Sequence, residues 1–235
     1  MSTFVLVHGA WHGGWCWRKV TPLLRAAGHD ALTPTLTGLG DRAHLASPAV
    51  DLELHVRDLL ATLEAEDARD IVLVGHSYGG VVGTVVADRA PERVARLIYL
   101  DAPIPADGQC AADLIAPAQF ADFQDRAQRT GDGWRFAPNP PAALGLDDLA
   151  DIAWAEPRLT PQPLATFTQP ARLTGAVGGV ARAFLFCAPA RAGSLLPEFA
   201  ARARAAGWPY AEVAAGHDAM IAAPAATAAA LLALA

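Results

Sequence analysis

The sequence predicts an α/β fold: a mostly parallel central sheet flanked by helices, with a small helical cap inserted into it. Three observations predict this. Short apolar runs, typical of buried strands, alternate with segments of helical spacing over roughly the first hundred residues. The alternation stops in a long stretch rich in proline and aromatic residues, and it resumes near residue 183. Alternating strands and helices form parallel sheets, because each helix returns the chain to the start of the next strand.

Glycine and proline delimit the elements of the first half. Gly28 follows a segment with helical spacing, and Pro91 stops the helix that follows the third apolar run. The second helix has apolar residues on one face, namely Leu52, Val56, Leu59, Leu60 and Leu63. We expect strands at Phe4 to Val7, Ala31 to Leu36 and Ile71 to Val74, and helices at Trp15 to Arg25, Asp51 to Glu66 and about Tyr78 to Arg89.

The second half contains the insertion and the end of the sheet. A strand from Ala95 to Leu100 ends at Asp101, and prolines then cluster among Phe and Trp residues from Pro105 to Gly179. We interpret residues 105–179 as a cap inserted within one domain that spans residues 1–235. After it we expect strands at Ala183 to Phe186 and Tyr210 to Val213, a helix around Pro197 to Ala206 and a packed terminal helix, Ala222 to Ala235.

Composition narrows the class of partner. Apolar residues make up 53% of the chain and charged residues 18%, which provides a sizeable core and argues against disorder. The formal charge is −6 and no run of like charges occurs, so we expect neither a nucleic-acid surface nor an anionic-membrane surface. A small-molecule substrate is the expected partner, and the sequence leaves both a monomer and a homodimer open.

The ends of the chain and its cysteines favour a cytoplasmic protein. The stretch from Met1 to His8 lacks the basic region of a signal peptide, and Ala222 to Ala235 is too short to span a bilayer. Cys16, Cys110 and Cys187 are odd in number and far apart, as expected for reduced thiols.

Neither a metal nor a cofactor is expected. No His or Cys spacing fits a zinc site. The pattern GxGxxA beginning at Gly38 matches a dinucleotide fingerprint, but it leads to Pro48 without a convincing helix. Pro161-Gln162-Pro163 is too short for a proline-recognition ligand, and we interpret it as a turn of the cap.

The candidate nucleophile is Ser77, in the GxSxG motif Gly75-His76-Ser77-Tyr78-Gly79. The motif follows an expected strand and precedes an expected helix, and glycines at the tight turn let the Ser77 hydroxyl project above the sheet edge. The helix N-terminus also favours developing negative charge. A chance glycine-rich turn is the alternative, and the flanking strand and helix disfavour it.

The candidate general base is His217. A serine hydroxyl is a poor nucleophile at neutral pH and needs a base, which this kind of fold supplies from the loop after the last strand. His217 lies in such a loop, directly before the terminal helix, and the chain has no other His after His76. A lone loop His is usually a surface residue, but its position and the order Ser then His favour a catalytic role.

The acid that orients His217 has two candidate positions. The loop after the strand ending at Phe186 has no carboxylate before Glu198. Asp101 ends the preceding strand at the catalytic edge of the sheet, and we therefore predict Asp101 as the third member of the triad. The alternative is that Asp101 only caps a turn before Pro103.

Two backbone N–H groups are predicted to stabilise the oxyanion. Acyl transfer uses the N–H after the nucleophile, here Tyr78, and one from the loop after the first strand, here Ala10. Trp11, His12 and Trp15 in the same loop are the predicted substrate-binding residues, and with the cap aromatics they indicate a largely apolar pocket.

These motifs resemble the plant methylesterase and hydroxynitrile lyase family of the α/β-hydrolase superfamily, with its bacterial esterase relatives. The similar segments are Val5 to Trp17, Thr33 to Arg42, Val74 to Gly80, Leu97 to Asp101 and Gly216 to Met220, and they cover nearly the whole chain. The resemblance implies an α/β-hydrolase fold, a small helical cap, and hydrolysis of esters of small, often aromatic or apolar acids without metal or cofactor.

The chain departs from this family at three positions. Family members usually carry the triad acid after the strand that here ends at Phe186, whereas an acid at the Asp101 position is similar to lipases and cofactor-free dioxygenases. Lyase members use a Thr at the Gly9 position and a Lys after the catalytic His, where this chain has Gly9 and Asp218. These two differences disfavour cyanohydrin cleavage.

The predicted function is a serine carboxylesterase acting on esters of small, largely apolar or aromatic acids. Two other classes stay open: a cofactor-free oxygenase or lyase that uses the same His217, and a ligand-binding protein with slow turnover. Oxygen consumption with aromatic hydroxy-ketones would favour the first. A ligand that raises thermal stability without being consumed would favour the second.

Overall fold

The computed structural model describes residues 1–190 and 193–235, and its centre is a six-stranded sheet. The strands are ordered β2-β1-β3-β4-β7-β8, and every pair is parallel. The predicted parallel sheet is therefore confirmed, and the carboxyl ends of its strands share one edge. The bounds are β1 (Thr3–Val7), β2 (Asp30–Leu32), β3 (Ile71–His76), β4 (Val94–Leu100), β7 (Ala181–Cys187) and β8 (Tyr210–Val213).

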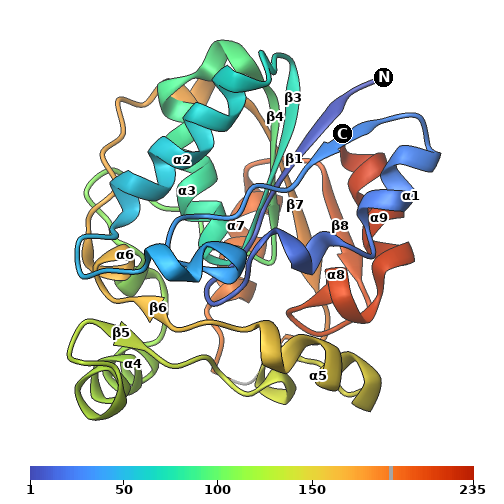
Figure 1. The fold of residues 1–235 in the computed structure, drawn as a ribbon. Coiled ribbons are helices and arrows are strands. Elements are labelled where there is room, and N and C mark those ends of the chain that lie inside the picture. The colour runs from blue at the N-terminus through green and yellow to red at the C-terminus, as the bar shows by residue number, and fades with distance from the viewer. Residues whose placement is uncertain (191–192) are drawn as a thin grey trace.

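Helices cover both faces of this sheet (Figure 1). Buried side chains from alternate strand positions point to opposite faces: Val5 and Val7 join one apolar cluster, and Phe4 and Leu6 join the other. The first cluster includes α2 (Leu52–Ala65), α3 (Tyr78–Arg89) and α7 (Leu196–Ala205), and the second includes α1 (Thr21–Ala26), α8 (Ala219–Ala222) and α9 (Pro224–Leu234). The flanking helices predicted from the sequence are thus confirmed.

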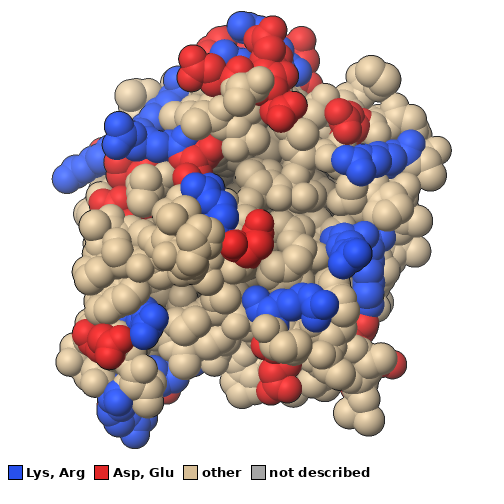
Figure 2. All heavy atoms as spheres, in the orientation of Figure 1, with Lys and Arg blue, Asp and Glu red and all other residues tan. Residues whose placement is uncertain are grey.

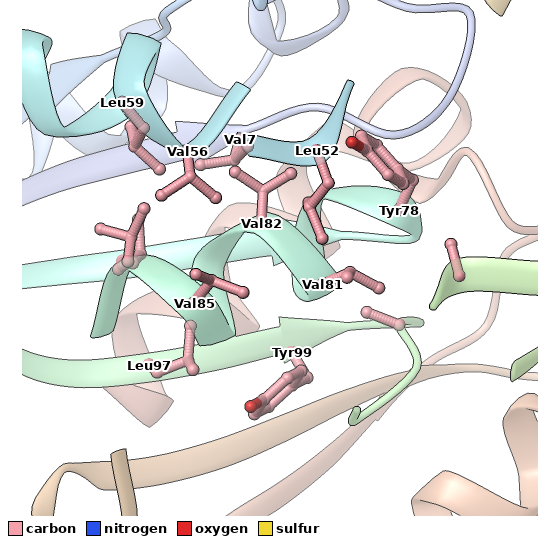
Figure 3. Packing of buried hydrophobic residues seen from close by; sticks show 14 of the residues in the cluster. Val7, Leu52, Val56, Leu59, Tyr78, Val81, Val82, Val85, Leu97 and Tyr99 are labelled. Atoms are coloured by element: carbon pink, nitrogen blue, oxygen red, sulfur yellow. The ribbon is translucent and has the colours of Figure 1, made fainter. Parts of the chain in front are cut away.

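Helix α3 is buried along nearly its whole length. Val81, Val82 and Val85 pack between α2 and the sheet, against residues such as Val56 and Leu97 (Figure 3). Burying one such side chain stabilises the fold by about 1.5–3 kcal/mol. The packing holds the N-terminus of α3, and with it Ser77, at a fixed place on the sheet edge.

The segment between β4 and β7 forms a separate layer at one end of the sheet (Figure 1). It contains α4 (Pro117–Thr130), α5 (Leu149–Ala155), α6 (Ala165–Thr168) and a small antiparallel sheet of β5 (Arg135–Phe136) and β6 (Gln162–Pro163). We call residues 105–179 the insertion. Short 3-10 turns in the chain cover Gly14–Trp17, Gly40–Leu45, Pro91–Arg93, Ala111–Leu114, Pro141–Leu144, Glu156–Arg158 and Ala176–Gly179.

Proline explains where three elements are shorter than predicted. The segment from Trp15 to Arg25 is a 3-10 turn followed by α1, because Pro22 suits the first turn of a helix and not its interior. Strand β2 ends at Leu32, since Pro34 has no N–H for the ladder. The terminal helix α9 begins at Pro224 and not at the predicted Ala222, and the short helix α8 precedes it.

The visible surface mixes charges of both signs. On the face shown in Figure 2, basic and acidic side chains are interspersed, with much uncharged surface between them. Within residues 1–190 and 193–235, none of the helices has the length and apolar character needed to cross a membrane.

Asp88 joins α3 to the end of the insertion. Its carboxylate accepts hydrogen bonds from the N–H and hydroxyl of Thr174 at 2.6 and 3.0 Å, and from the N–H groups of Gly175 and Val177 at 3.0 and 2.9 Å. Burial alone would raise the pKa of Asp88, but these donors outweigh burial and lower it below its usual value. The ionised carboxylate therefore stabilises the segment that leads into β7.

We predict that Asp88→Asn lowers the free energy of unfolding at pH 7 by roughly 2 kcal/mol, the scale of hydrogen bonds to a charged group. Because the folded pKa is depressed, the stabilisation is present above the unfolded pKa and is lost as pH falls through the folded pKa. Urea unfolding of wild type and variant should therefore differ less in acid than at pH 7. The control is Asp125→Asn, whose carboxylate forms an exposed pair with Arg129. Equal stability of both variants at pH 7 would contradict the role of Asp88.

Candidate active site

Ser77 occupies a strained bend between β3 and α3. Its φ of 53° and ψ of −124° are uncommon for a residue with a side chain. The bend packs so tightly that a Cβ on Gly75 would lie 2.5 Å from the carbonyl oxygen of Gly79, and a Cβ on Gly79 would lie 2.7 Å from those of Val7 and His8. Glycine is therefore required at both flanking positions, as the GxSxG motif predicts.

His217 and Asp101 are brought together although they are far apart in the sequence. His217 Nδ1 lies 2.6 Å from Asp101 Oδ2, and Asp101 is 4% exposed. The backbone N–H of Asp101 donates to the carbonyl of Leu185 at 2.8 Å, and Asp101 Oδ1 accepts the N–H of Cys187 at 3.3 Å. With its Nδ1–H directed to the carboxylate, the neutral His217 ring keeps Nε2 free to accept a proton.

Ser77, His217 and Asp101 all line one pocket. Across the described residues, no hydrogen bond joins the Ser77 hydroxyl to the His217 ring. Hydrogen bonds between catalytic groups are often long in ligand-free proteins and tighten when substrate binds. Ser77 and His217 thus line the same cavity, and we expect the hydrogen bond between them to form when substrate binds.

Ala10 and Tyr78 also line this pocket. Among the hydrogen bonds of the described residues, none uses the backbone N–H of either one as donor. Tyr78 is the first residue of α3, where N–H groups have no acceptor within the helix. Both groups remain candidates to receive an oxyanion beside Ser77.

An apolar wall of aromatic rings closes the pocket on the side of the insertion. Trp11, Phe123 and Phe167 line it, and Phe136 packs behind them with ring-centroid distances of 4.5 Å to Phe123 and 5.2 Å to Phe167. The cavity volume is about 90 Å³. A volume several times the ~15 Å³ that one water needs admits small apolar groups and not long chains.

His12 and Trp15 lie outside this lining, in contrast to Trp11. His12 is 1% exposed and its ring contacts the carbonyl of Ala10 and the carboxylate of Asp218. Trp15 stacks on the His12 ring at 5.3 Å and lines a different surface hollow. Among the described residues, Trp11 is the one predicted substrate-binding residue of the three that lines the pocket beside Ser77.

Two buried histidines near the first loop serve the structure. His8 accepts the N–H of Leu36 at Nε2, 3.1 Å, and burial lowers the pKa of His8 to about 3. His55 contacts the Tyr78 hydroxyl and the carbonyl of Thr37, and burial lowers its pKa to about 4. Both rings are neutral at pH 7 with both nitrogens engaged, so neither competes with His217 as a base.

The insertion holds the His217 loop by a contact between two glycines, which sequence reasoning missed. A Cβ on Gly145 would lie 2.5 Å from Cα of Gly216, and one on Gly216 would lie 2.4 Å from Cα of Gly145. Beside them, the N–H of Asp218 donates to the carbonyl of Leu144 at 2.9 Å. The sequence feature that could have indicated this contact is Gly216, next to the predicted base. Its partner Gly145 lies 71 positions away in the sequence.

Gln162 was also missed, because the sequence suggested only a turn there. Its buried side chain accepts the N–H of Trp11 at Oε1, 3.0 Å, and donates to the Thr166 hydroxyl at 2.7 Å. The N–H of Thr160 donates to the carbonyl of Trp11 at 2.9 Å. The insertion thus holds the N–H and the carbonyl of Trp11, the residue next to Ala10. These two hydrogen bonds support the positive φ of 66° at Trp11.

No group of three or more His, Cys, Asp or Glu side chains within residues 1–190 and 193–235 is arranged to hold a metal ion. The alternative position for the triad acid, the loop after β7, includes residues 191–192, which lie outside the described residues.

The chain belongs to the alpha/beta hydrolase family, whose model matches residues 4–230. A carbendazim hydrolyzing esterase of Nocardioides sp. is 40% identical over 230 residues, 94% of each chain. Methylesterase 9 of Arabidopsis thaliana is 36% identical over 106 residues, 45% of this chain and 41% of that protein. An extracellular alpha/beta-hydrolase structure from a Paenibacillus species has a TM-score of 0.88 at 22% identity, covering 100% of this chain and 99% of that chain. The predicted resemblance to bacterial esterases and plant methylesterases, and the predicted fold class, are confirmed.

We predict that Gly145→Ala displaces the His217 loop and lowers kcat for ester hydrolysis by about 100-fold, the cost of a shift of about 1 Å at a catalytic group. The added methyl must push against backbone, and Gly145 also has a φ of +82°. The control is Gly178→Ala in the same insertion, where a Cβ meets nothing within 4 Å. Unchanged kcat in Gly145→Ala would show that this contact does not position His217.

Proposed function

We propose that this chain is a serine carboxylesterase that hydrolyses esters of small, largely apolar or aromatic acids. The observation that carries the proposal is the 2.6 Å contact of His217 with Asp101, made at the pocket that Ser77 lines. Esterase activity also agrees with the named activities of the bacterial and plant relatives. No metal, dinucleotide, nucleic acid or second copy of the chain has a part in this mechanism.

Each group in the pocket has one role in the proposed reaction. Ser77 Oγ attacks the ester carbonyl carbon while His217 Nε2 takes the hydroxyl proton, and the carbonyl electron pair moves to the oxygen. The N–H groups of Ala10 and Tyr78 stabilise that oxyanion, and Asp101 stabilises the His217 imidazolium. The ester C–O bond then breaks as His217 returns the proton to the leaving alcohol. Water, activated by the same His217, releases the acid from Ser77.

The substrate class follows from the shape and lining of the pocket. Apolar and aromatic side chains line most of it, and the insertion, acting as a cap, supplies Leu114, Phe123 and Leu144. A small apolar cavity admits a compact acyl or alkyl group and excludes long chains. A cytosolic location belongs to the same proposal, supported by the free thiols of Cys16, Cys110 and Cys187.

We expect Ser77→Ala to abolish hydrolysis of p-nitrophenyl acetate above the uncatalysed rate, because Ser77 supplies the attacking hydroxyl. The matched control is Ser194→Ala, since Ser194 lines the same pocket but bonds to the N–H of Leu196. Initial rates by absorbance at saturating ester give the comparison. Equal activity of wild type and Ser77→Ala would end the proposal.

Asp101→Asn should preserve the fold and lower kcat by up to about four orders of magnitude, the scale known for a mis-oriented triad histidine. The amide can donate to His217 Nδ1 and so favours the tautomer that carries its proton on Nε2, which cannot act as base. Steady-state kinetics with circular dichroism as the check on folding measure this. A decrease below threefold would reject Asp101 as the acid.

A further inference from the structure

A second buried histidine–carboxylate pair lies behind the pocket, and the proposed mechanism does not use it. His12 Nε2 is 2.9 Å from Asp218 Oδ2, and both side chains are buried. Asp218 directly follows His217, and the other ring nitrogen of His12 is 2.7 Å from the carbonyl oxygen of Ala10. One imidazole therefore connects the residue that donates to the oxyanion with the residue beside the general base.

Proton counting indicates the charge state of the pair. The carbonyl oxygen of Ala10 only accepts, so His12 Nδ1 must carry a proton, and the contact between Nε2 and the carboxyl group requires a second one on one of these two groups. Burial would lower the pKa of His12, but the carboxylate of Asp218 outweighs burial and raises it. Burial would likewise raise the pKa of Asp218, and His12 lowers it. Stacking of Trp15 on the His12 ring also suits a cation.

We propose that His12 and Asp218 are positioning residues, an imidazolium–carboxylate bridge that holds the Ala10 loop and the His217 loop in one catalytic geometry. The inference rests on the proposed function, and it assigns to His12 a role different from substrate binding. Its effect reaches the reaction through His217 and Ala10, not through contact with substrate.

Asp218 has no other hydrogen-bond partner for its carboxylate in the described part of the chain. Its Oδ1 is buried and unpaired, and the nearest cationic candidate, His76 Nε2, is 3.9 Å away. That His76 nitrogen instead contacts the carbonyl oxygen of His217 at 2.9 Å. Removing the His12 proton would leave a buried carboxylate without a charged partner, which is strongly unfavourable. The loop that carries His217 would then have to move.

Four buried titratable groups near the pair carry no charge at pH 7: His8 and Cys16 in the loop after β1, His76 at the end of β3 and Cys187 at the end of β7. His217 also lies near the pair, and its own partner is the Asp101 carboxylate. Burial lowers the pKa of His8 and His76 and raises the pKa of Cys16 and Cys187, so these four groups are neutral at pH 7. The positive charge of protonated His12 is therefore the charge that balances the Asp218 carboxylate.

A pH dependence follows with a definite sign. The folded pKa of His12 is raised, so the bridge is intact below the unfolded pKa and is lost as pH rises through the folded pKa. The kcat profile of the wild type should therefore fall on the alkaline side, and we assign that fall to His12.

The test measures kcat, KM and the pH profile of kcat for His12→Gln, Asp218→Asn and the double variant, with exposed His44→Gln as the control. We expect His12→Gln to lower kcat by about 10- to 100-fold, with KM unchanged and the alkaline fall abolished. Asp218→Asn keeps an acceptor for His12 but removes the charge, so the alkaline fall should move to lower pH by about one unit or more. The double variant should be no slower than the slower single variant.

An unshifted alkaline fall in both single variants, or full kcat in His12→Gln, would overturn the inference. If His12→Gln does not fold, the shift of the alkaline fall of kcat in Asp218→Asn decides whether the inference holds. Nitrogen NMR of labelled histidines adds a readout independent of activity: both ring nitrogens of His12 should be protonated at pH 7, and a neutral His12 ring would overturn the bridge. If the wild type has no esterase activity, both the proposed function and this inference are contradicted. If the wild type is active and the variants are unaffected, this inference alone is contradicted.

Discussion

The hydrogen bond between His217 and Asp101 is the interaction on which the arrangement of the site depends. Asp101 follows β4, His217 follows β8, and β7 lies between these strands in the sheet. Asp101 bridges the gap because its backbone N–H and its carboxylate both bond to β7, at Leu185 and Cys187. Asp101 thus follows β4 but is anchored on β7, within reach of the His217 loop that follows β8.

The insertion contacts the loops of the proposed catalytic residues and also forms part of the pocket wall. Gly145 and Leu144 contact the loop of His217, and Thr160 and Gln162 hold the backbone of Trp11. The proposed general base and the proposed oxyanion donor of the first loop are therefore both fixed against the same segment. Changes in the insertion that alter which ester fits are expected to alter the rate of the chemistry too.

Local pattern was enough to predict the sheet, the Ser77 bend and the residue types around it. Strand and helix periodicity lie in adjacent residues, and the glycines at positions 75 and 79 report a steric requirement that is itself local. Asp101 was selected because the other candidate loop lacked a carboxylate, and the structure places it against His217.

The remaining features depend on contacts between distant residues. Gly145 meets Gly216, Gln162 meets Trp11, and His12 meets Asp218, which is 206 positions away. No local pattern encodes such pairs, and a histidine in a glycine-rich loop beside two tryptophans suggests a binding residue as readily as a buried ion pair. The boundaries of α1 and β2 were missed for a different reason, since proline restricted elements whose apolar pattern continued beyond them.

In the proposed reaction, His217 activates the hydroxyl of Ser77 to form a covalent acyl-enzyme. Labelling of the wild type with a fluorophosphonate, followed by mass-spectrometric mapping of the modified peptide, tests it most directly. We predict a single adduct on Ser77 that forms far more slowly in His217→Ala. An adduct on another residue, or an equal labelling rate in the two proteins, would contradict it.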